Sequence, residues 1–237
     1  MQKLIVVTGG TKGIGRAIVE RFAQEGHAVV TCARSAADLL VLSDTMAQKY
    51  PDVSVYTLAA DLSHPRDTAR FIDFVRSLKG EVEVLVNNTG GFEPGRLQDE
   101  PTDGSQLRRM IDVNLYSAYD ITQGLLPDMI ARRAGHIFNM CSTASITAYT
   151  NGGSYCIAKF ALYGMTKVLR AELREHNIRV TAVLPGATLT NSWEGTDLPP
   201  ERFMCPEDVA DAIFSAYSLS PRAVVEEILI RPQLGDI

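Results

Sequence analysis

Short runs of apolar residues alternate with longer amphipathic stretches along this chain of 237 residues. The apolar runs are rich in β-branched residues, which is typical of parallel strands buried on both faces. They predict strands at residues 4–7, 27–33, 53–59, 82–86, 136–140, 179–184 and 224–230. Helical spacing of apolar residues falls between them, at residues 16–26, 35–48, 65–78, 105–132, 154–176 and 206–219. This alternation predicts an α/β fold, a doubly wound parallel sheet with helices on both faces.

No internal repeat or linker interrupts this pattern, so we expect one domain over residues 1–237. The net charge of −5 and the lack of a basic stripe argue against a nucleic-acid partner. The longest apolar runs are strand-sized and the N-terminus is too short for a signal peptide, so we expect no membrane span and no export. Cys32, Cys141, Cys156 and Cys205 are scattered, which is typical of reduced thiols in a cytoplasmic protein. The histidines are dispersed as well, and we expect no metal site.

A glycine-rich turn joins the first predicted strand to the first predicted helix. Its glycines have the spacing Gly-x-x-x-Gly-x-Gly and would let the backbone approach a pyrophosphate that rests on the helix N-terminus. Such a turn can also be only a tight connection, but strand, turn and helix together are the setting that a dinucleotide site requires. The candidate cofactor contacts here are Gly9, Thr11, Lys12, Gly13, Ile14 and Gly15.

The end of the second predicted strand bears on which dinucleotide is bound. An acidic residue there would hold the adenosine ribose hydroxyls and select NAD, but Cys32-Ala33-Arg34-Ser35 contains none. Arg34 can instead pair with a 2′-phosphate through two N–H groups, and Lys12 can reach the same phosphate. Both could be ordinary surface cations, yet their joint placement favours NADP(H). Asp61, after the third strand, either meets the adenine amino group or caps the next turn.

The stretch from residue 142 to 159 holds the candidate catalytic residues. Tyr155 and Lys159 are one helical turn apart, so both side chains lie on one face of the predicted helix. A neighbouring cation stabilises a phenolate and lowers the pKa of the phenol, so the pair is a plausible device for proton transfer. Ser142 could supply a hydroxyl that holds a carbonyl or alcohol oxygen. Asn114 is a polar residue in an apolar neighbourhood and must find partners there.

Seven motifs stand in one order along the chain: Thr8-Gly9-x-x-x-Gly13-Ile14-Gly15, Asp61-Leu62, Asn87-Asn88-x-Gly90, Asn114, Ser142, Tyr155-x-x-x-Lys159 and Pro185-Gly186-x-x-x-Thr190. With these motifs, the chain resembles the short-chain dehydrogenase/reductase family over nearly its whole length. It departs from the family at Thr89, where alanine is usual, and at Thr188, where an apolar residue is common. The resemblance implies a Rossmann-type sheet of seven parallel strands in the order 3-2-1-4-5-6-7.

The resemblance also implies a role for each catalytic candidate. Tyr155 would be the acid/base, and Lys159 would lower its pKa and bind the nicotinamide ribose. Ser142 would orient the substrate oxygen, and Asn114 would hold a water that links Lys159 to solvent. Further contacts to NADP(H) would come from Asp61, Leu62, Asn88, Gly90, Pro185, Gly186, Thr188 and Thr190.

We therefore expect an NADP(H)-dependent oxidoreductase that transfers a hydride reversibly between the nicotinamide and a small-molecule carbonyl or secondary alcohol. The alternatives are a non-catalytic, dinucleotide-binding regulator on the same fold, which would usually lose the tyrosine or lysine, and an epimerase or dehydratase, which would need a larger substrate region. Residues 187–205 would form the substrate lid, in which Trp193 either covers the substrate or plugs the lid against the body. The family resemblance suggests a homodimer or homotetramer formed through the helices at residues 105–132 and 154–176.

Overall fold

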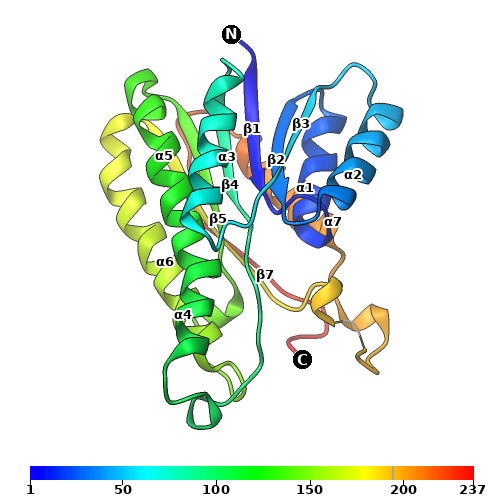
Figure 1. Ribbon diagram of the computed structural model, residues 1–237, viewed down its shortest axis with the longest axis vertical. Coiled ribbons are helices and arrows are strands. Elements are labelled where there is room, and N and C mark those ends of the chain that lie inside the picture. Colours follow the sequence, from blue (N-terminus) through cyan, green and yellow to red (C-terminus); the bar gives the residue numbers. More distant parts are fainter. Residues whose placement is uncertain (194) are drawn as a thin grey trace.

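One seven-stranded sheet forms the centre of the molecule in the computed structural model, which describes residues 1–193 and 195–237 (Figure 1). Its order is β3-β2-β1-β4-β5-β6-β7, and every pair of neighbouring strands is parallel. The predicted fold class and strand order are thus confirmed. The strands are β1 (Lys3–Thr8), β2 (Ala28–Ala33), β3 (Val55–Ala59), β4 (Glu81–Asn87), β5 (Gly135–Met140), β6 (Ile178–Pro185) and β7 (Glu227–Ile230).

Helices cover both faces of this sheet, because successive residues of each strand point to opposite faces. Ile5 and Val7 of β1 are buried in one core, against α1 (Gly13–Gln24), α2 (Ala36–Lys49) and α7 (Pro206–Ser218). Leu4 and Val6 are buried in the other core, against α3 (Pro65–Ser77), α5 (Ser117–Arg132) and α6 (Gly153–Leu173). Figure 1 shows these two helical layers on opposite sides of the strands.

The predicted helix over residues 105–132 is confirmed in its bounds, but its middle contains a π-helical turn that was not predicted. The structure has α4 (Ser105–Ile111), one π-helical turn at Asp112–Tyr116, and then α5. The side-chain amide of Asn114 donates to the Met110 carbonyl at 3.0 Å, four residues back, where a helical backbone bond would end. A single π turn inside an α-helix is often found at a functional site. Pro127 lies inside α5.

The final strand is shorter than predicted. It covers Glu227–Ile230 instead of residues 224–230, and its pairing with β6 begins at Ala182, whose N–H donates to the Glu226 carbonyl at 3.0 Å. Within the described part of the chain, no helix is long and apolar enough to cross a membrane.

Candidate active site

The glycine-rich turn between β1 and α1 is tightly packed against the end of β4. Gly9 and Gly13 have φ values of +71° and +52°, a region that favours glycine. A Cβ atom on Gly15 would lie 2.2 Å from the Gly9 carbonyl oxygen, so a side chain cannot be accommodated there. The side-chain amide of Asn88 donates to the carbonyls of Thr8 and Gly9 at 2.9 and 3.2 Å. The turn is therefore a shaped backbone cradle at the N-terminus of α1, which fits a phosphate group.

The segment after β6 closes one side of this cradle. A Cβ on Gly13 would lie 2.9 Å from the Thr190 methyl group, so Thr190 lies directly over the turn. Thr188 is buried, and its hydroxyl donates to the Gly186 carbonyl at 3.1 Å, while the Gly186 N–H donates to Ile230 at 2.8 Å. Of the predicted contacts after β6, the structure therefore brings Thr190 to the glycine turn.

Two of the predicted cofactor residues have side chains turned into the protein core. Leu62 is buried in the core of the α3, α5 and α6 face, and Ile14 packs against the core of the opposite face. Their side chains serve packing, and only their backbone groups can reach a bound nucleotide. For Asp61, the structure favours the capping alternative: its carboxylate accepts from the Ser63 N–H at 3.0 Å and from the Ser63 hydroxyl at 2.7 Å. Burial would raise the pKa of Asp61, but these hydrogen bonds outweigh it and keep the pKa below its usual value.

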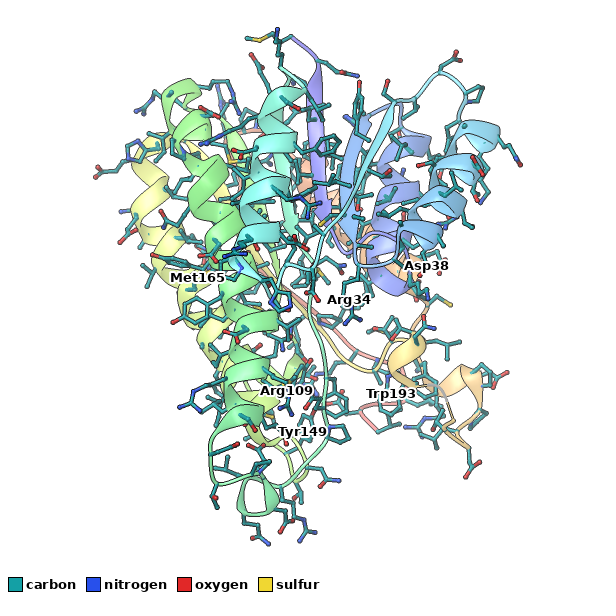
Figure 2. The ribbon with its side chains drawn as sticks, viewed as in Figure 1. Arg34, Asp38, Arg109, Tyr149, Met165 and Trp193 are labelled. Atoms are coloured by element: carbon teal, nitrogen blue, oxygen red, sulfur yellow. The ribbon has the colours of Figure 1, made fainter. Side chains whose placement is uncertain are left out.

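One of the two cations predicted to bind a 2′-phosphate, Lys12, lies beside a carboxylate that sequence reasoning missed. Arg34 is exposed, and the Lys12 ammonium forms an ion pair of 3.0 Å with Asp38 in the first turn of α2. Figure 2 shows Arg34 and Asp38 near this edge of the sheet, above Trp193. The Asp38 N–H donates to the Ser35 hydroxyl at 3.1 Å, as the predicted N-cap requires. The sequence signalled the cap, but nothing in it signalled that Asp38 also holds Lys12.

Tyr155 and Lys159 extend from the first two turns of α6 toward the end of β5. The buried Lys159 ammonium donates to the Met140 carbonyl at 2.8 Å and lies 5.8 Å from the centre of the Tyr155 ring. Tyr155 forms a side-chain hydrogen bond with Ser142, which follows β5 and caps a short 3-10 turn. Three of the four predicted catalytic side chains thus meet at the carboxyl edge of the sheet.

Asn114 reaches the same place from the π turn. It is fully buried, its amide group donates to Gly91 at 2.9 Å, and its oxygen accepts from the Gly91 N–H at 3.2 Å. A Cβ on Gly90 would lie 2.8 Å from that oxygen and 3.4 Å from the Lys159 ammonium. Gly90 thus lies between Asn114 and Lys159, and only a glycine leaves the two polar groups so close.

The pKa values of the pair do not follow the expectation from sequence. Burial raises the pKa of Tyr155 to about 12, against an opposing hydrogen bond with Ser142, and burial lowers the pKa of Lys159 to about 8. In the protein by itself burial dominates the pKa of Tyr155, and a lowering of that pKa by Lys159 stays a prediction. Desolvation disfavours the charged form of both groups, and the ammonium is engaged with the Met140 carbonyl instead of the phenol. At neutral pH, Tyr155 is therefore a protonated phenol, ready to donate.

Aromatic side chains border this site. The exposed Phe92 ring meets the Tyr155 ring edge-on, with 5.0 Å between centroids. Tyr149 is 46% exposed, and the burial of its remaining surface raises its pKa. Trp193 packs edge-on against Phe203 within the predicted lid, with 4.9 Å between centroids.

A cavity of about 570 Å³ lies elsewhere, between α1, α7 and the segment after β6. Gly13 and Thr190 border it, but none of the four catalytic candidates does. Its charged walls are paired, Arg16 with Glu20 and Arg21 with Asp211, both at 2.6 Å. The cavity is therefore separate from the edge of the sheet at which Tyr155, Lys159 and Ser142 lie.

Comparison with known proteins agrees with this arrangement. A family model described as short chain dehydrogenase matches residues 3–198. The chain is 34% identical over 245 residues to a sepiapterin reductase from Chlorobaculum tepidum, with 100% of this chain and 99% of that protein covered. The chain belongs to the short-chain dehydrogenase family and is an oxidoreductase of that type.

Solved structures of similar proteins share its fold and contain NADP-type cofactors. The L-sorbose reductase of Gluconobacter frateurii, solved with NADPH and L-sorbose, has a TM-score of 0.88 and 27% identity, covering 98% of this chain and 95% of its own. An alcohol dehydrogenase from the archaeon Thermococcus sibiricus, solved with 5-hydroxy-NADP, has a TM-score of 0.88 and 26% identity, covering 98% of this chain and 97% of its own.

The lowered pKa of Lys159 predicts the pH dependence of catalysis. The kcat/KM for carbonyl reduction should be level below pH about 8 and fall as the pH rises through that value. Above it, a neutral Lys159 would not stabilise a phenolate at Tyr155, the acid that the family resemblance implies, whereas Tyr155 itself stays protonated. The measurement is a pH profile of kcat/KM, which reports the free enzyme. A profile that stays level up to 10.5, the ordinary lysine value, would contradict this assignment.

Proposed function

We propose that this chain catalyses reversible, NADP(H)-dependent reduction of a carbonyl group in a small molecule. One observation carries the proposal: a protonated phenol, hydrogen-bonded with Ser142 and neighbouring the buried ammonium of Lys159, stands at the same edge of the sheet as the glycine cradle. Family membership supplies the reaction class, and the similar structures that contain NADPH or 5-hydroxy-NADP support the cofactor.

The residues present fit NADP(H). The glycine turn and the N-terminus of α1 would hold the pyrophosphate, and Arg34 with Lys12 would hold the 2′-phosphate. Asn88, Gly90 and the residues after β6 would line the path to the nicotinamide, and Lys159 would hydrogen-bond its ribose. When bound as NADPH, the cofactor supplies the hydride that reaches the carbonyl carbon.

The protein's own side chains handle the oxygen and the proton. Ser142 hydrogen-bonds the carbonyl oxygen and orients it toward Tyr155. Tyr155 donates its proton to that oxygen as negative charge develops there. The Lys159 ammonium, once drawn toward the tyrosine, stabilises the resulting phenolate. Asn114, whose side-chain oxygen lies beside Gly90, holds a water that returns a proton to this pair.

Residues 187–205 are proposed to form the substrate lid of a single domain. Backbone bonds from Leu189 to Met204 and from Met204 to Ala187, at 2.9 and 3.0 Å, join its two ends, and Trp193 packs against Phe203 within it. Because Trp193 is the single tryptophan of the chain, its fluorescence reports this segment, and a signal indifferent to NADPH and substrate together would count against a lid.

We also propose a homodimer or homotetramer and a cytoplasmic location. Apolar side chains that are 41–55% exposed lie on the π turn and on α5 and α6: Tyr116, Tyr119, Ile157, Phe160 and Val168. Exposed apolar residues gathered on neighbouring helices are typical of an interface. A mass of one chain by light scattering would contradict the assembly. The four cysteines are free thiols, as a reducing compartment requires, and fractionation of cells tests the location.

Tyr155→Phe removes the proton donor and keeps the ring contact with Phe92. It should reduce turnover by at least about 100-fold, in line with the loss of general acid catalysis. NADPH affinity should change little. The assay is NADPH consumption over a panel that includes sepiapterin, ketoses, diketones, aldehydes and quinones, with NADPH titrated separately. Near-normal turnover by the mutant would reject Tyr155 as the acid, and a wild-type protein that binds NADPH but is silent over the panel would favour the regulator.

Arg34→Ala tests the choice of cofactor. It should weaken NADPH binding by about 10-fold or more while leaving NADH binding almost unchanged, because only NADPH has the 2′-phosphate. Arg66→Ala, which removes an exposed arginine from the start of α3, is the matched control. Equal losses for the two dinucleotides, measured by equilibrium titration, would remove Arg34 from the phosphate site.

A further inference from the structure

A carboxylate from a distant loop caps the helix that carries the catalytic pair. Glu100 lies in the connection between β4 and α4, and it accepts the Ser154 N–H of α6 at 2.8 Å. The Ser154 hydroxyl donates to the second oxygen of the same carboxylate. Ser154 is fully buried, and the N-cap position of α6 is Gly152, which has no side chain to cap the helix. The first turn of α6 therefore takes its cap from 54 residues earlier in the chain.

The space around this contact leaves no room for a side chain at the first residue of α6. Gly153, the first residue of α6, has a φ of +30°, and a Cβ there would lie 2.3 Å from the Glu100 carboxylate and 2.6 Å from the Gly95 carbonyl. The Gly95 N–H in turn donates to the Asn151 carbonyl at 3.0 Å. The loop before α4 and the turn before α6 are thus joined through both side chain and backbone.

This junction connects the two sides of the proposed carbonyl site. Tyr155 directly follows Ser154 on α6, while Phe92 belongs to the same loop as Glu100 and touches the Tyr155 ring edge-on at 5.0 Å. A negatively charged group at the start of a helix stabilises that helix. A carboxylate that accepts two hydrogen bonds also fixes the orientation of the donor groups as well as their distance. A shift of the first turn of α6 would move the Tyr155 hydroxyl away from Ser142.

We propose that Glu100 is a positioning residue, whose carboxylate anchors the loop that carries Phe92 to the first turn of α6 and so sets the place of the Tyr155 hydroxyl. This inference rests on the proposed function, in which Tyr155 is the acid. Glu100 acts on the rate through Tyr155 and does not contact the NADP(H) cradle at the other end of the site.

Glu100→Ala should lower kcat by about 10-fold or more, since small displacements of a catalytic group are costly, and leave the NADPH dissociation constant within about two-fold. Glu100→Gln should recover most of the rate, because its amide oxygen still accepts the Ser154 N–H and its NH₂ group can donate to the Ser154 hydroxyl. Gly153→Ala keeps Glu100 in the sequence but puts a methyl group where its carboxylate lies. This variant should reproduce the loss of kcat.

Asp103→Ala is the matched control. Asp103 stands in the same loop and accepts the Ser105 N–H at 2.8 Å, but it caps α4 instead of α6. If loop stability alone mattered, both alanine variants would lower the melting temperature and both would lower kcat alike. The positioning role predicts that only Glu100→Ala lowers kcat while leaving the NADPH affinity unchanged.

Hydrogen exchange of residues 153–159 supplies a readout that does not need a substrate. Exchange there should rise in Glu100→Ala and stay near the wild-type rate in Asp103→Ala and Tyr155→Phe. The positioning role would be overturned if Tyr155→Phe is inactive while Glu100→Ala keeps both the wild-type kcat and the wild-type exchange. Full turnover in Tyr155→Phe would instead overturn the proposed function, and the exchange rates would still decide whether Glu100 anchors α6.

Discussion

All seven strands are parallel, and this one constraint places the loops that carry most of the candidate side chains. The carboxyl ends of parallel strands lie at the same edge of the sheet, so the loops that follow them gather there. The glycine turn follows β1, Arg34 follows β2, Asn88 follows β4, Ser142 follows β5 and Gly186 follows β6. Residues more than a hundred positions apart in the chain thus come together, although the loops that carry them do not pair with one another. The side-chain amide of Asn88, bonded to the carbonyls of Thr8 and Gly9, joins the two central loops at the point where the strand order reverses.

Burial at this edge sets the chemistry of the proton donor. Desolvation keeps Tyr155 neutral and lowers the pKa of Lys159. Tyr155 is therefore a phenol, and Lys159 is an ammonium that loses its proton readily. This state suits reduction, in which the phenol must give up a proton. Oxidation of an alcohol needs the phenolate instead, and the positive charge of an oxidised nicotinamide nearby would stabilise it. In the proposed mechanism, the direction of the reaction would therefore be coupled to the protonation state of Tyr155 through the cofactor.

Much of this arrangement follows from the sequence because its signals are local. Apolar runs and helical spacing predicted the strands and helices, and the order of the motifs, through the family resemblance, predicted the strand order. Ser35 was recognisable as a cap because its partner, Asp38, is three residues away. The π turn at Asn114 was not predictable from periodicity, and the hydrogen bonds that hold Asn114 to Gly91 join residues 23 positions apart.

The same limit explains the residues that sequence reasoning missed. Glu100 looks like an ordinary loop acid, and only the fold brings it to Ser154. The Lys12–Asp38 ion pair joins a loop to a different helix, and no spacing rule connects the two. The pKa values of Tyr155 and Lys159 depend on burial, which two residues on one helical turn do not reveal. Long-range packing and desolvation are thus what the sequence left open.

The central claim is that the glycine cradle and the tyrosine–lysine pair serve one cofactor. A crystal structure of the protein with NADPH tests it most directly. The account predicts the pyrophosphate on the turn at Gly13, the 2′-phosphate beside Arg34, and the nicotinamide against Tyr155 and Lys159. A nicotinamide ring turned away from Tyr155, or lodged in the cavity between α1 and α7, would contradict it.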